Sequence, residues 1–478
     1  MIKKLSIGFS VFIIFIASGI IAQEAVPYQT VNDKGSRKTF VQVLENYIDL
    51  ALANNLDLAL LRQNAEESNA DRKEALSGFF PKLSFQSRYS TAGGGRKIII
   101  DVNQFIGGLF PGMQFPVVEE SFLRPHEQET KFNATQVLFA GGAVLNAYNA
   151  KSSMYDASLC NLETAKWNKR LETAEAYLNF LKASELVKIK DHVLNLSREG
   201  LNITESLYRQ DKLLKSDVMR AGVNVSKAES DLAEASEQKR LAQRFFNNLL
   251  NRDVFTVIEE SPVSYEEAAK MDTFNAKMDN AANEINTLEA TALSRRKEIE
   301  SLNHSLDALS NIKNIAFSDY LPKVILSVDY GWQGEEYSFN SESDYYMASL
   351  VFQVNLFDGL GREARMEKAV SQEKELEIQK LIAMRSIGLQ VEQAYLKLHT
   401  ARKQIKAAEE QLVSAEENYR IVQKRFSLGM ALSLDMNDAL VQLDIAGSTR
   451  VIALYDYIAA IEKMKNVLGF ENKEYLND

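Results

Sequence analysis

The 478-residue chain has few of the residues that interrupt helices or cross-link loops: it contains 22 glycines, 7 prolines and one cysteine. So little proline and glycine disfavours a loop-rich fold and favours long, uninterrupted elements. The single cysteine, Cys160, excludes an intrachain disulfide. The formal net charge is -10 and no basic cluster is present, so we expect no nucleic-acid partner.

Residue patterns for catalysis or for cofactor binding are also missing. The stretch TAGGGRKIII, at 91–100, lacks the spacing of a phosphate-binding loop and has no Ser or Thr after its lysine. No nucleophile and base stand in a recognisable pattern, so we expect no enzyme, no cofactor and no metal. The four histidines are scattered without ligand spacing: His126, His192, His304 and His399.

Long hydrophobic runs are absent after the N-terminus. A lysine pair at 3–4 precedes the apolar run 5–22, which is followed by polar residues. This order is typical of a secretory signal peptide, residues 1–22, cleaved after Ala22. An uncleaved membrane anchor stays open as an alternative, because the run is almost long enough to span a bilayer. We expect no lipoprotein anchor, since no cysteine follows, and any other membrane crossing must use strands.

The chain also repeats itself. At an offset of 218 residues, aromatic, glycine and aspartate residues of the first half recur in the second half. The stretches ALSGFFPKL (75–83) and AFSDYLPKV (316–324) repeat at an offset of 241, so the first copy carries a 23-residue insertion between positions 83 and 139. The pairs 218 residues apart include Phe139 and Phe357, Gly141 and Gly359, and Asp217 and Asp435.

Within each copy the hydrophobic period is close to seven residues. Large apolar residues recur at this interval from Phe180 to Tyr208 and from Leu398 to Phe426, and the segments that follow carry alanine at the same interval. Sustained heptads predict coiled-coil-like packing of long helices. An ordinary soluble helical bundle is the alternative, but about 100 Å of continuous helix from residue 142 to 208 disfavours it.

Four stretches of about ten residues alternate between apolar and polar side chains, a length that crosses a bilayer as a tilted strand. A small periplasmic sheet packed on a helix would alternate in the same way and stays open as an alternative. Four strands cannot close a membrane barrel, so strands that span would require an oligomer. Pro81 and Pro322 mark the helix-to-strand turns. The aromatic residues near strand ends, which suit an interfacial girdle, are Tyr330, Trp332, Tyr345 and Tyr346.

These patterns predict two copies of helix, strand, strand, helix, helix. The first copy covers 23–250, with helices at 41–78, 142–210 and 216–250 and strands at 81–92 and 127–139. A linker at 251–284 leads to the second copy, 285–468, and a tail covers 469–478. The second copy has helices at 285–318, 361–428 and 433–468 and strands at 322–333 and 344–357.

This layout resembles the TolC-like outer-membrane efflux channel family. The resemblance rests on the duplication, on the junctions VLFAGGAVLN and NLFDGLGREA, and on the tip motifs YRQDKLLKSDVMRAG and KRFSLGMALSLDMNDAL. It implies a mainly α fold with a small β part, located in the outer membrane of a Gram-negative bacterium. Three copies would form a twelve-stranded β-barrel in outer-membrane lipid, continued by a periplasmic α-barrel of long helices.

The resemblance also implies a function and partners. The homotrimer would be the exit duct of a tripartite efflux or type I secretion system, whose tip meets a periplasmic adaptor protein and an inner-membrane transporter. The alternative is a non-spanning periplasmic coiled-coil adaptor or scaffold. An adaptor typically has one helical hairpin between β-rich domains, whereas here the helical pair is duplicated. The insertion is interpreted as a long extracellular loop.

Residue roles follow from the same resemblance. Asp435 and Asp438 match the tip aspartates that form the constriction of the family's tunnels, where a trimer would build rings of carboxylates. That Asp217 and Asp435 are only helix caps stays open as an alternative. Ala431 stands where some members carry an arginine, so we expect no inter-helix bridge from that position.

The remaining expected sites are turns. The barrel–helix junctions fall at Phe139, Gly141, Phe357 and Gly359. Because Asp211 stands where the second copy has Gly429, we expect the two tip turns to differ in shape. The residues expected to form the tip turns and to contact the adaptor are Gly429, Ser433, Asp211 and Asp217.

Overall fold

A computed structural model describes residues 39–469, except 92–96, 102, 104–115, 122–125, 273–280 and 337. The expected signal peptide, part of the insertion and the tail beyond Gly469 lie outside these described residues. Every element below belongs to one compact unit, which begins at Phe40.

Each copy of the repeat starts with a helix that is interrupted once. The first copy has α1 (Phe40–Asn54) and α2 (Leu56–Ser77), and the second has α7 (Ala281–Arg295) and α8 (Lys297–Ser318). The prediction of single helices at 41–78 and 285–318 is therefore wrong. Asn55 and Arg296, 241 residues apart, have extended backbones. The Asn55 side chain caps α2, and the Arg296 guanidinium donates to Gln390 Oε1 at 2.7 Å.

The strands form two antiparallel sheets. The larger has the order β1 (Lys82–Thr91), β4 (His126–Ala140), β5 (Lys323–Gly334), β6 (Asp344–Gln353). β6 ends four residues before the predicted end at 357, because its last partner is Lys323 and the preceding Pro322 has no N–H to donate. The insertion, expected as a loop, contains a second sheet of β2 (Lys97–Ile100) and β3 (Val118–Ser121).

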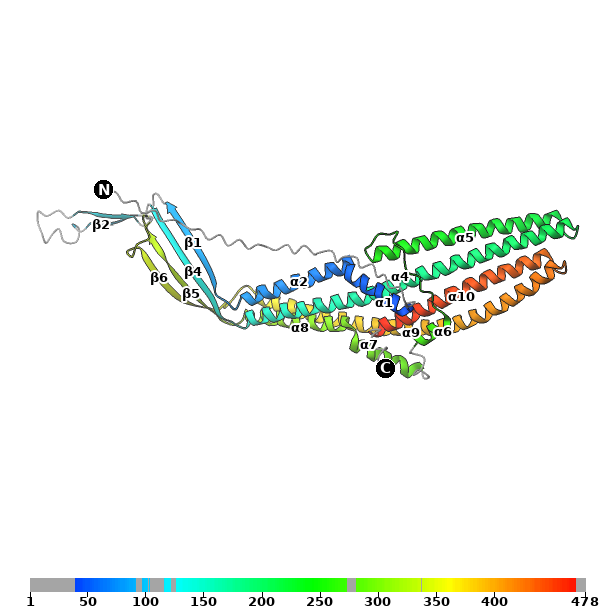
Figure 1. Ribbon diagram of the computed structural model, residues 1–478. Helices are drawn as coiled ribbons and strands as arrows, with labels where there is room; N and C mark the ends of the chain where they lie inside the picture. The colour runs from blue at the N-terminus through cyan, green and yellow to red at the C-terminus, as the bar shows by residue number, and fades with distance from the viewer. Residues whose placement is uncertain are drawn as a thin grey trace, which may run out of the picture. The chain divides into compact units, whose positions relative to one another are not determined.

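Two long helical hairpins follow the sheet (Figure 1). α4 (Ala143–Arg209) returns as α5 (Lys215–Leu249), and α9 (Gly361–Ser427) returns as α10 (Ser433–Leu468). α4 and α9 have 67 residues each, about 100 Å at 1.5 Å per residue. A short helix, α6 (Tyr265–Met271), lies between the copies. Among the described helices, none is both long and apolar enough to cross a membrane.

Most of the predicted heptad positions are buried between the helices, whereas Tyr208, at the end of the first series, is exposed. The largest cluster joins α1 with α4, α5, α9 and α10, and a second cluster lies between α4, α9 and α10 nearer the tip turns. Small side chains line the contacts of α5 and α10, which lets these helices approach their neighbours closely. Buried heptad residues include Phe180, Leu194, Leu398, Ile405, Phe426, Ala221, Ala228, Ala439 and Ala446.

Candidate functional site

The four-stranded sheet has one apolar face that is exposed in the single chain. The register aligns Phe85, Phe132, Tyr330 and Tyr346 in one row across all four strands. The Phe85 and Phe132 ring centroids are 5.1 Å apart, and Trp332 packs against Tyr330 at 5.4 Å. Exposed apolar surface of this extent is typical of a membrane or protein contact. The most exposed members of this face are Leu83 (80%), Tyr346 (83%), Phe352 (68%) and Leu350 (66%).

The opposite face of the sheet is polar and internally bonded. The Asn133 amide donates to Asp329 Oδ1 at 2.5 Å, and Lys131 Nζ lies 3.1 Å from Glu129 Oε1. The Tyr345 hydroxyl donates to the same Glu129 oxygen at 2.9 Å. Because neighbouring strand residues point to opposite faces, Tyr345 belongs to the polar face. Its prediction as a girdle residue is therefore wrong, whereas Tyr330, Trp332 and Tyr346 do share the apolar face.

The helix-to-strand turns have the same backbone pattern in both copies. In the first, the amides of Gly78, Phe79 and Phe80 donate to carbonyls three residues earlier, and Pro81 precedes β1. The second copy repeats these bonds 241 residues later, in the turn that ends at Pro322. A residue before proline is biased toward extended backbone, which suits the start of a strand.

The strand-to-helix junctions also share one backbone conformation. Gly141 and Gly142 have φ of 60° and 86°, and Gly359 and Leu360, 218 residues later, have φ of 72° and 68°. These left-handed residues turn the chain from strand into helix, which glycine does at little cost. The aromatic residues before the turns, Phe139 and Phe357, are 48% and 75% exposed.

Charged side chains bond the strand end to the helix start at the second junction, and among the described residues the first junction has no matching set. Arg362 donates to the carbonyls of Asn355 and Leu356 at 2.8 and 3.2 Å, and Arg365 bridges Asp358 and Asp319. Desolvation opposes ionisation of Asp358, but hydrogen bonds from the Arg362 amide, Arg365 and the Gly361 amide lower its pKa. The first junction has apolar residues at the matching positions and is instead packed closely on Leu321.

The two tip turns have the same shape, contrary to expectation. Asp211 has φ of 58° and Gly429 has φ of 72°. In both turns this amide donates to the carbonyl three residues earlier, and the next amide donates to the carbonyl five residues earlier. The prediction of different shapes was wrong because aspartate is one of the few residues that adopt the left-handed conformation at modest cost.

The tip aspartates differ in their bonding. The carboxylate of Asp217 accepts the Leu214 amide at 3.1 Å, and that of Asp435 accepts the Leu432 amide at 3.1 Å, so both cap the returning helices. Asp438 is exposed, one turn further along α10. Ser433 is the first residue of α10 and not its N-cap, which is Leu432. Asp435 is exposed as well.

Two buried or half-buried carboxylates that the sequence did not reveal fix the segment between the copies. The Asp272 side chain is fully buried, and Arg402 contacts both its oxygens at 2.7 and 2.8 Å. The Tyr457 hydroxyl also donates to Asp272 at 2.6 Å. Desolvation and this bond raise the pKa of Tyr457. Glu260 accepts bonds from Ser184 and Lys239 at 2.8 and 2.7 Å.

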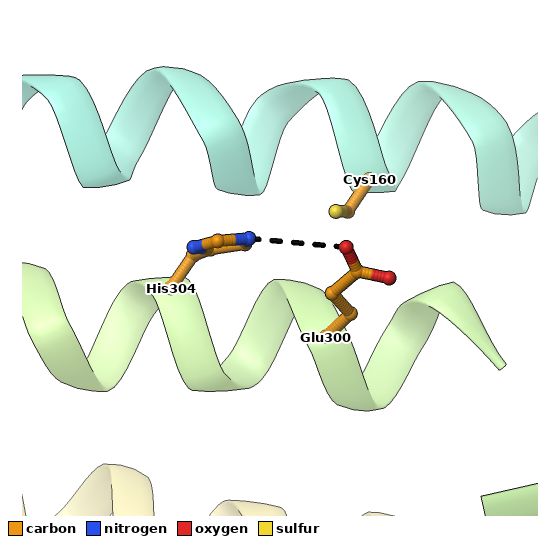
Figure 2. A group of neighbouring side chains, drawn as sticks. All are labelled: Cys160, Glu300 and His304. Carbon is orange, nitrogen blue, oxygen red and sulfur yellow. Dashed lines mark ion pairs between the residues drawn. The ribbon is translucent and has the colours of Figure 1, made fainter. Parts of the chain in front are cut away.

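One group of side chains has the composition of a metal site. Cys160 of α4 faces Glu300 and His304 of α8 (Figure 2). The ligand atoms of the three side chains lie within 4.8 Å of one another. Burial raises the pKa of the Cys160 thiol. Only the four-residue spacing of Glu300 and His304 was visible in the sequence, because Cys160 is brought to them by helix packing.

Comparison with known proteins identifies the fold and the family. The model of the outer membrane efflux protein family matches residues 47–252 and 288–470, more than half of the chain. No protein with a curated description matches the chain. Several solved structures share the fold, among them CusC, VceC and MtrE. CusC, described for transmembrane channel formation, is 16% identical, with a TM-score of 0.76 and coverage of 92% of this chain and 96% of its own.

The other two are outer membrane proteins of named bacteria. VceC of Vibrio cholerae is 16% identical, with a TM-score of 0.73 and coverage of 89% of this chain and 96% of its own. The MtrE outer membrane channel of Neisseria gonorrhoeae is 19% identical, with a TM-score of 0.73 and coverage of 90% and 89%. The family model matches the chain twice, once in each copy of the repeat. The chain therefore belongs to the outer membrane efflux protein family.

Proposed function

We propose that three copies of this chain form a channel through the outer membrane, which acts as the exit duct of a tripartite efflux or type I secretion system. Membership of the family places the chain among outer-membrane transport channels. The observation that carries the finer proposal is the four-stranded sheet, which has an exposed apolar face and a bonded polar face. Within the described residues its edge strands, β1 and β6, pair on one side only.

The unpaired edges require partners if the sheet lies in lipid. Unpaired backbone groups cost several kcal/mol each in a bilayer, so a spanning sheet must close into a ring. Successive strands of the sheet are antiparallel, so β6 of one copy and β1 of the next would also run antiparallel. A closed barrel could therefore form from several copies of this chain alone, with each copy contributing four strands.

The number of copies is limited by the width of the barrel. Two copies would give eight strands, about the number at which side chains fill the interior. Three copies would give twelve strands and leave an open lumen. The polar network of Glu129, Lys131, Asn133 and Asp329 would then line water, and the aromatic row through Tyr330 and Tyr346 would contact lipid.

The helical hairpins would continue this barrel into the periplasm. Both tip turns lie side by side, since a Cβ at Gly429 would come 3.7 Å from Lys212. Rings of Asp435 and Asp438 at the tip would narrow the duct and bind cations. We infer that these turns contact the periplasmic adaptor, which connects the duct to an inner-membrane transporter. The family match favours this function over a periplasmic adaptor or scaffold.

Single-channel conductance tests the constriction. Asp435→Asn with Asp438→Asn removes the ring charge and keeps an oxygen at position 435 to cap α10. We expect weaker block by divalent cations and altered cation selectivity. Asp217→Asn, at the matching cap of the first copy, is the control and should change neither. Unchanged block in the double variant would exclude the constriction, and a freely soluble monomer after osmotic release would exclude the channel itself.

A further inference from the structure

We propose that Cys160, Glu300 and His304 bind a divalent transition-metal ion of the zinc type, which joins α4 to α8. The three ligand atoms come from two helices and lie within 4.8 Å of one another. The proposal does not depend on the channel function, because all three residues lie within one chain.

The geometry of α8 presents two of the ligands together. Glu300 and His304 are four residues apart, so they lie on one face of the helix. The His304 Nε2 atom is 4.0 Å from Glu300 Oε1, while Lys297 bonds the other carboxylate oxygen, Oε2. Lys297 of the same helix thus binds one oxygen of the Glu300 carboxylate, and the other oxygen faces the His304 imidazole.

The third ligand comes from the facing helix. Cys160 is 7% exposed and points from α4 toward the Glu300 carboxylate (Figure 2). Ligand atoms around one zinc ion lie roughly 3.4–3.6 Å apart at its usual bond lengths and tetrahedral angle. Glu300 is exposed and His304 is half-buried, so both side chains can rotate. Small rotations would bring the three ligand atoms from their present separation, within 4.8 Å, to the separation around a zinc ion.

The chemistry of the three groups selects the class of ion. Thiolate, imidazole and carboxylate are the ligands of zinc, whereas magnesium and calcium prefer oxygen alone. Binding forms a metal–sulfur bond and releases the thiol proton to solvent. The three protein ligands leave a fourth position for water. Without an ion, the same contact would be only a hydrogen bond from the thiol and an ion pair of histidine with glutamate.

Cobalt is a suitable probe, because a cobalt–thiolate bond gives a charge-transfer band in the near ultraviolet. The full chain, purified in detergent without a polyhistidine tag, should bind one cobalt ion with this band, and zinc should displace it. Cys160→Ser should abolish the band. His304→Gln and Glu300→Gln should each weaken binding at least as much as the 10–100-fold loss typical of an outer-shell partner. His192→Gln, an exposed histidine of α4, is the matched control and should bind normally.

A second measurement keeps the proposal testable if the Cys160→Ser variant does not fold. Cys160 is the only cysteine, so maleimide labelling reports on it alone. Zinc should slow the labelling of the natural chain and leave that of His304→Gln unchanged. Absence of the cobalt band in the natural chain would overturn the proposal. If both Glu300→Gln and His304→Gln bound cobalt as tightly as the natural chain, the proposal would also be overturned, since the thiol would then bind alone.

Discussion

Both copies of the repeat bind the connecting segment, 251–284, through side chains at matching positions, but the types of these side chains differ. Ser184 and Lys239, which bind Glu260, are each 218 residues before Arg402 and Tyr457, which bind Asp272. In the first copy the cation comes from the returning helix, α5. In the second copy it comes from the outgoing helix, α9, and the carboxylate is fully buried. In both copies the same pair of helix positions binds a carboxylate of the connecting segment, but the cation that binds it comes from a different helix in each copy.

The two ion pairs should contribute different free energies of stabilisation, because Asp272 is buried and Glu260 is partly exposed. Removal of each cation in turn tests this difference most directly. Arg402→Ala leaves the buried Asp272 carboxylate without its cation and with only the Tyr457 hydroxyl as a partner, which should lower the free energy of unfolding by about 3–5 kcal/mol. Lys239→Ala exposes a carboxylate that is already one-third exposed and should cost less than about 1 kcal/mol. Denaturant unfolding of both variants in detergent, followed by circular dichroism, measures the two costs.

A second substitution controls for packing at Arg402. Asp272→Asn combined with Arg402→Met removes both charges, keeps most of the side-chain volume and should recover part of the loss. Equal costs for Arg402→Ala and Lys239→Ala would contradict the assignment of different strengths to the two copies.

The two junction glycines give the next largest expected difference. A Cβ at Gly141 would lie 2.8 Å from Leu321 Cβ and 3.0 Å from the Ser318 carbonyl, whereas one at Gly359 would meet no atom within 4 Å. Both positions have positive φ, so alanine costs about 1–2 kcal/mol at either. Gly141→Ala should add an overpacking cost of about 1–3 kcal/mol.

The difference between the two variants is therefore the informative quantity, because the backbone cost is common to both. Thermal unfolding of Gly141→Ala and Gly359→Ala, measured side by side, isolates the packing contribution. If Gly359→Ala were the less stable variant, an unrecognised contact of the second junction would have to exist, for example with another copy of the chain.

Much of this architecture could be predicted because the duplication shows every element twice. The paired junctions at Gly141 and Gly359, the strands and the heptad seams follow from local periodicity. The interruptions at Asn55 and Arg296 were missed, since neither residue is a glycine or a proline. Contacts between distant segments, such as Asp272 with Arg402 or Cys160 with Glu300, depend on helix packing that a single sequence does not contain.

The two tip turns should differ only slightly in stability, because they share one backbone conformation. Asp211→Gly relieves a left-handed non-glycine residue and should raise the free energy of unfolding by less than about 1 kcal/mol. Gly429→Asp should lower it by a similar amount. Opposite shifts of the unfolding midpoint, with no change in helix content, are the expected result. If both substitutions shifted the midpoint in the same direction, the backbone conformation alone would not explain the residue preference of one of the turns.

The smallest expected effect is the contribution of Glu260 to the pH dependence of stability. Desolvation favours its neutral form, but bonds from Lys239 and Ser184 and the charge of Lys188 lower its pKa below the ordinary 4.5. A carboxyl group with a lowered pKa in the folded state stabilises the fold above its unfolded pKa. That stabilisation is lost as the pH falls through the folded pKa, and solvent exposure keeps it below about 1 kcal/mol.

Glu260→Gln should therefore be less stable than the natural chain at neutral pH and equally stable in acid. Glu259→Gln is the matched control, because within the described residues its carboxylate has no cation at ion-pair distance. Unfolding midpoints between neutral and acidic pH measure the difference. If the two variants lost stability in parallel, the Lys239 cation would contribute nothing specific, and the first copy would hold the connecting segment through the Ser184 hydrogen bond and apolar packing alone.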